Sequence, residues 1–117
     1  MRDHTKYHVW QRAMELAVAV HRATESLNPR EVPGLRSQLR RAAASIPANI
    51  SEGAAQQTDT QFARFVAIAL ASLQEVEHHL AFGCAMGALS ADDIAPLTRE
   101  LTQIRRMTLA LHRALTH

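Results

Sequence analysis

The chain has 117 residues, 47% of them hydrophobic and 21% charged, and its formal net charge is +2. A hydrophobic share of this size excludes wholesale disorder, and a chain of this length is typical of a single domain, which we expect to span residues 1–117. The small positive charge is compatible with nucleic-acid binding but does not require it.

The first two predicted helices follow from apolar residues that recur at intervals of three and four. The first covers residues 7–27 and ends before the Asn28-Pro29 pair, because proline disfavours helical geometry in the residue before it. The second covers residues 35–57 and contains Pro47. Three apolar turns continue in register beyond this proline, so the sequence predicts one bent helix, not two.

The third and fourth predicted helices begin at recognisable capping residues. The third covers residues 59–87, follows Thr58, and closes at Gly87, which suits a left-handed C-terminal position. The fourth covers residues 91–116 and follows Ser90, another residue that caps helix N-termini well.

Four helices joined by short loops bury their apolar stripes most economically against one another in antiparallel order. The sequence contains no strand pattern. We therefore predict an all-α fold, an up-down antiparallel four-helix bundle.

The cysteine content and the hydropathy of the chain indicate in which cellular compartment the protein is expected. Cys84 is the single cysteine, which excludes an intrachain disulfide and fits a reducing compartment. No run approaches the roughly 20 apolar residues that a membrane helix needs, and the N-terminus lacks the apolar stretch of a signal peptide. We expect a cytoplasmic protein with no membrane partner.

The outward face of the third helix is more apolar than a solvated face should be, and the second helix turns alanines outward. Such surfaces favour self-association, since monomers rarely expose large apolar patches. The alternative is that a bend or turn of the bundle buries these residues internally. The candidate oligomer-interface residues are Ile68, Ala71, Phe82, Met86, Ala44 and Ala48.

Arginines repeat at helical spacing on the fourth helix and, less regularly, on the second. Three of them lie seven residues apart on one face, about 10 Å per step, a spacing that can follow a phosphate backbone. The alternative is an ordinary arginine-decorated helix surface. The candidate nucleic-acid-binding residues are Arg99, Arg106, Arg113, Arg36 and Arg40.

No constellation of residues predicts catalysis, a metal site or a cofactor. Glu75 and His78 have the spacing of di-iron bundles, but a second copy of that motif and two further inward glutamates are absent. Cys84 is interpreted as an inert core residue. Asn49 and Glu52, close to Pro47, are interpreted as structural, with a ligand site as the secondary reading.

Three segments resemble the four-helix-bundle proteins encoded in intervening sequences of 23S ribosomal RNA genes. They are residues 9–13 (VWQRA), 40–53 (RRAAASIPANISEG) and 62–77 (FARFVAIALASLQEVE). Ser51 and Ala71 depart from the usual pattern of the family. The resemblance implies an up-down bundle that often assembles as a homopentamer, with no assigned catalytic residue. It also implies kinship with the accessory protein of diversity-generating retroelements, which binds nucleic acid and a reverse transcriptase through basic surfaces.

Two functions from different classes remain open at this point. The first is a homo-oligomer, with five subunits favoured, that binds nucleic acid, RNA more than DNA, through basic outer faces. The second is a scaffold that docks a partner polypeptide without nucleic acid. Neither reading includes an enzymatic activity.

Overall fold

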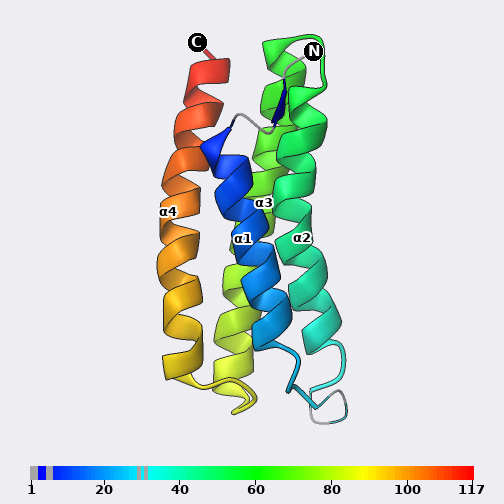
Figure 1. Ribbon diagram of the computed structural model, residues 1–117, viewed down its shortest axis with the longest axis vertical. Helices are drawn as coiled ribbons and strands as arrows, with labels where there is room; N and C mark the ends of the chain where they lie inside the picture. Colours follow the sequence, from blue (N-terminus) through cyan, green and yellow to red (C-terminus); the bar gives the residue numbers. More distant parts are fainter. Residues whose placement is uncertain (1–2, 5–6, 29, 31) are drawn as a thin grey trace.

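In the computed structural model, which describes residues 3–4, 7–28, 30 and 32–117, four helices make up the chain. They are α1 (His8–Ala23), α2 (Leu35–Ala54), α3 (Asp59–Ala85) and α4 (Ala91–Leu115), and no strand occurs among these residues. Figure 1 shows that successive helices run in opposite directions along a body that measures 45 × 21 × 19 Å. The predicted all-α bundle is confirmed.

The helices form a ring of four in cross-section. α2 contacts α1 and α3, and α4 closes the ring by contacting α3 and α1. Over the described residues neither α1 with α3 nor α2 with α4 makes a contact, so these two pairs lie on the diagonals. This arrangement decides which outward faces adjoin one another: the outward faces of α2 and α4 lie on opposite sides of the molecule.

The core consists of residues spaced by threes and fours on each helix, as the apolar periodicity predicts. Burying these side chains removes them from water, and that burial supplies most of the stability of a helical bundle. The largest fully buried side chains include Leu16 and Val20 of α1, Leu39, Ile46 and Ile50 of α2, Phe62, Val66, Leu73 and Val76 of α3, and Leu101 and Ile104 of α4.

The predicted caps of α3 and α4 are confirmed. The Thr58 hydroxyl accepts a hydrogen bond from the backbone N–H of Gln61 at 3.2 Å, and the Ser90 hydroxyl accepts one from the N–H of Asp93 at 3.0 Å. Each bond satisfies a donor that has no partner inside the helix. Gly87 adopts φ +75°, the left-handed conformation expected after the end of α3.

The helices are shorter than predicted at their C-termini. α1 ends at Ala23, not at residue 27. The Glu25 N–H bonds the Arg22 carbonyl in place of the His21 carbonyl, which accepts instead from the Thr24 hydroxyl at 3.1 Å and from Arg40 at 2.9 Å. α2 ends at Ala54, not at residue 57, because Thr58 must be extended to cap α3. α3 and α4 end at Ala85 and Leu115, two residues and one residue before the predicted ends.

Pro47 lies inside α2, which continues as one helix from Leu35 to Ala54 as predicted. The side-chain amide of Asn49 donates to the Ser45 carbonyl at 2.8 Å and to the Ser45 hydroxyl at 2.9 Å. That hydroxyl lies 2.8 Å from the hydroxyl of Ser72 on α3. Asn49 therefore belongs to a polar link between α2 and α3 beside the proline.

Candidate nucleic-acid and subunit interfaces

The outward face of α4 carries the three predicted arginines, Arg99, Arg106 and Arg113, and all three are exposed. Arg99 and Arg106 make no hydrogen bond or ion pair with any residue that the structure describes. Arg113 donates only a long hydrogen bond, 3.5 Å, to the carbonyl of Leu109 on its own helix. The guanidinium groups of this α4 arginine stripe are therefore available to a ligand.

Two acidic side chains on and beside α4 are paired with arginines outside the stripe. Glu100 binds Arg12 of α1 through Nε–Oε1 at 2.5 Å, and Glu77 of α3 binds Arg105 at 2.6 Å. The hydrogen bond from Arg12, together with its charge, lowers the pKa of Glu100, although partial burial works against that shift. No acidic residue occurs from residue 101 to residue 117. The C-terminal two-thirds of α4 therefore presents positive charge without an acidic neighbour in the same segment.

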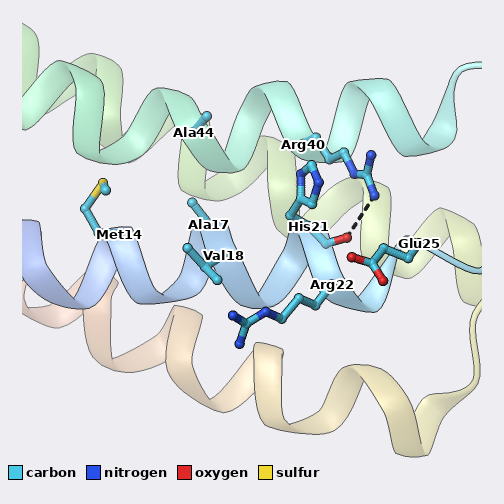
Figure 2. Close-up of a pocket in the computed structure, with 8 residues that line it drawn as sticks. All are labelled: Met14, Ala17, Val18, His21, Arg22, Glu25, Arg40 and Ala44. Carbon is cyan, nitrogen blue, oxygen red and sulfur yellow. Dashed lines mark hydrogen bonds between the residues drawn. The ribbon is translucent and has the colours of Figure 1, made fainter.

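The two predicted arginines of α2 lie elsewhere. Arg40 donates through Nε to the Thr24 hydroxyl at 2.9 Å. A terminal nitrogen of Arg40 also donates to the His21 carbonyl at 2.9 Å, the bond dashed in Figure 2. Arg36 donates to the Glu25 carbonyl at 3.5 Å. Both side chains cap the C-terminal end of α1, and α2 lies diagonal to α4. Within one chain the structure does not bring them to the α4 stripe.

The apolar stripe predicted on α3 faces outward in the folded chain. The exposed fraction is 48% for Ile68, 45% for Phe82 and 55% for Met86, and Ala71 is exposed between them. The ring of Phe82 stacks on that of His78, with centroids 6.4 Å apart. The bundle therefore does not bury these residues internally, which was the alternative to an interface.

A second apolar surface lies in the groove between α1 and α2, which has a volume of about 350 Å³. Figure 2 shows Ala44 of α2 on one wall and Met14, Ala17 and Val18 of α1 on the other. Met14 and Val18 are 42% and 45% exposed. Ala48, the other alanine predicted to face outward on α2, is exposed one turn further along. We call this surface the α1–α2 groove.

Met14 and Val18 were not predicted as surface residues from the sequence. The available signal was the series Met14, Val18 and Arg22, in steps of four, which places two large apolar residues on a line outside the core stripe of the first helix. A row of apolar residues beside a core stripe is easily assigned to the core, because the sequence does not show where the neighbouring helices lie.

Histidine and acidic residues do not gather into a metal centre in the described part of the chain: no group of three or more His, Cys, Asp or Glu there could hold an ion. Nε2 of His79 lies 3.6 Å from Oε1 of Glu75, and the same oxygen lies 3.7 Å from Arg41. Cys84, expected in the core, is only partly buried, because the α3 position that packs inward there is Gly83. None of the four described helices is long and apolar enough to cross a membrane.

These features define a class: an antiparallel four-helix bundle with two outward apolar surfaces and one outward arginine stripe. The sequence model of the 23S rRNA-intervening sequence protein family matches residues 5–110. The chain belongs to this family. A comparison with curated protein sequences gives no match.

Proposed function

We propose that this protein is a non-enzymatic, cytoplasmic homo-oligomer that binds RNA through the α4 arginine stripe. The observation that carries the RNA-binding part is the exposure of Arg99, Arg106 and Arg113 on one face, with two of them free of any partner among the described residues. Such a face contacts phosphates without reading sequence, because guanidinium groups bind the backbone and not the base edges.

The family name supports RNA over DNA, since it refers to a sequence that intervenes in 23S rRNA. The two outward apolar surfaces support the oligomer, because exposed patches of this kind usually mark interaction sites. The resemblance stated above favours five subunits. A cyclic assembly would repeat the α4 stripe once per subunit, so an RNA that reaches several subunits would gain affinity from each one.

The test is a salt titration of RNA binding with matched arginine variants. The double variant Arg99→Gln with Arg106→Gln keeps the helix, since both residues propagate helices well. We expect it to weaken binding to all structured RNAs alike. The slope of log affinity against log salt should flatten by roughly 0.7 to 0.9 for each phosphate that the variant no longer neutralises.

The matched control replaces Arg30 and Arg64 with glutamine. Both are exposed, neither side chain has a partner among the described residues, and the loss of charge is the same. We expect the control to retain most of the affinity and of the salt dependence. Equal losses in the two double variants would refute the α4 stripe as the binding face. Absence of RNA binding by the unaltered protein at low salt would favour a scaffold that docks a partner polypeptide.

A further inference from the structure

We propose that the α3 stripe of one copy docks in the α1–α2 groove of the next copy, so that subunits join head to tail in a ring. This inference rests on the proposed homo-oligomer and specifies its interface. It concerns two unlike surfaces of the same chain. One is the Ile68–Ala71 part of the α3 stripe with the neighbouring Glu75, and the other is the groove, with Met14, Val18, Ala44 and Arg22.

Contacts within the chain place the apolar parts of the two surfaces at the same height along the bundle. The Ser45 and Ser72 hydroxyls are 2.8 Å apart on antiparallel helices, so Ala44 and Ala71, each one residue before its serine, lie within about 3 Å of the same height. Ala44 lines the groove together with Met14 and Val18. The apolar floor of the groove is therefore level with the Ile68–Ala71 part of α3.

The charged residues of the two surfaces also lie at similar heights along the bundle. Arg40 binds the His21 carbonyl at 2.9 Å, and the next residue, Arg41, lies 3.7 Å from Glu75. Arg22, which follows His21, therefore lies within about one helical turn of Glu75 along the bundle. Arg22 is exposed and has no partner among the described residues, and the Glu75 side chain is 42% exposed.

A rotation about an axis parallel to the helices preserves these heights. When it brings α3 of one copy to the groove of the next, Ile68 and Ala71 meet Met14 and Val18. In the same register, Glu75 meets Arg22. Apolar surface then covers apolar surface, and Glu75 faces the end of the groove that carries Arg22 and Arg40 together with the single carboxylate Glu25 among its lining residues. This match favours a second copy as the occupant of the groove. Because the two surfaces differ, the contact is heterologous and builds a ring when the rotation closes.

The arrangement also agrees with the position of the arginine stripe. α2 lies between the two docking surfaces and α4 lies diagonal to α2. In a ring built by these contacts, α2 turns toward the axis and α4 toward the outside. The α4 stripe therefore remains accessible on the outer wall of the assembly.

The test uses two variants that each block one surface, with molar mass measured by light scattering. Val18→Asp places a charge in the groove, and Ile68→Asp places one on the α3 stripe. Both positions are nearly half exposed, so folding should tolerate the changes, and circular dichroism checks this. We expect each variant alone to have the mass of one 13.0 kDa chain.

A mixture of the two variants retains one intact pair of surfaces, the α3 stripe of the first variant and the groove of the second. We expect the mixture to form a dimer, twice 13.0 kDa, and nothing larger. As a control, Leu109→Asp changes an equally apolar residue on α4, 39% exposed, and should leave the mass of the oligomer unchanged.

The other outcomes separate the two proposals. An unaltered chain that is monomeric would overturn the oligomer and this interface together. If the unaltered chain is oligomeric, a blocked variant that keeps the full mass would overturn the interface alone. A mixture that stays monomeric would likewise overturn it, since two intact complementary surfaces would then fail to associate.

Discussion

Arg12 and Glu100 join α1 to α4 with two parallel hydrogen bonds, Nε–Oε1 at 2.5 Å and a terminal nitrogen to Oε2 at 2.9 Å. This two-pronged geometry is the strongest arrangement available to an arginine and a carboxylate. It lowers the pKa of Glu100 and raises that of Arg12. The contact between α1 and α4 therefore depends on pH.

The sign of that dependence follows from the lowered pKa. In the unfolded chain Glu100 titrates near its ordinary value of 4.5, and in the folded chain it titrates below that value. The ion pair contributes its full stability above 4.5, and this stability is lost as the pH falls through the lowered pKa.

We expect Glu100→Gln to lower the melting temperature slightly at neutral pH, since 37% of the Arg12 side chain and 31% of the Glu100 side chain stay exposed. The difference in melting temperature between the variant and the unaltered chain should shrink as the pH falls below 4.5. Thermal unfolding followed by circular dichroism measures it. Glu52→Gln, at an exposed position without such a pair, should show no such pH-dependent deficit. A Glu100→Gln deficit that stays constant into acid would contradict the assignment.

The contacts of single side chains could be predicted from the sequence only in part. The sequence placed Arg40 in a basic run, and its guanidinium instead satisfies the His21 carbonyl at the end of α1, 19 residues away. The partner of such a donor depends on how two helices pack, which a local pattern does not contain. The exposed positions of Arg99, Arg106 and Arg113 required only helical periodicity and were predicted correctly.

At the scale of helices, the close approach of α2 to α3 depends on Gly53. A Cβ built on this residue would lie 2.6 Å from Cδ1 of Phe62 and 2.9 Å from Cβ of Phe65, both on α3. The contact with Phe65 involves an atom fixed to the backbone, which cannot move aside without moving α3. Gly83 differs, because its nearest neighbour, at 2.7 Å, is the terminal Cδ1 of the flexible Leu89 side chain.

We therefore expect Gly53→Ala to destabilise the fold by about 1–3 kcal/mol, the typical cost of overpacking. In a helix interior, alanine ordinarily stabilises the fold by roughly 0.5–1 kcal/mol relative to glycine. Helix propensity alone would therefore predict a stabilising effect of this substitution, the opposite of what we expect. Gly83→Ala, the matched comparison, should cost less, because Leu89 can change rotamer. Urea denaturation of both variants measures the difference. Equal stability of Gly53→Ala and the unaltered chain would show that the helices do not approach this closely.

The number, order and starts of the helices were predictable because periodicity and capping residues are local signals. Thr58 and Ser90 each marked a helix start, and the structure shows their capping bonds. The C-terminal ends were less predictable, since apolar residues continue beyond them. At α1 the end involves the His21 carbonyl, which accepts from the Thr24 hydroxyl and from Arg40 of α2.

At the scale of the whole molecule, the bundle separates two kinds of surface. Most of the exposed large apolar side chains lie on α1 and α3, with outward alanines on α2 between them, and the arginine stripe lies on α4, diagonal to α2. The sequence predicted the α3 and α4 surfaces from single helices. It did not predict the α1–α2 groove, because a groove exists only when two helices are placed side by side.

The central claim is that copies of this chain assemble and that the assembly binds RNA. Native mass spectrometry of the unaltered protein with a structured RNA tests both parts in one measurement. We expect a complex whose mass equals several 13.0 kDa chains plus RNA and which dissociates as salt is raised. Single 13.0 kDa chains with no RNA bound, at low salt and micromolar concentration, would contradict it.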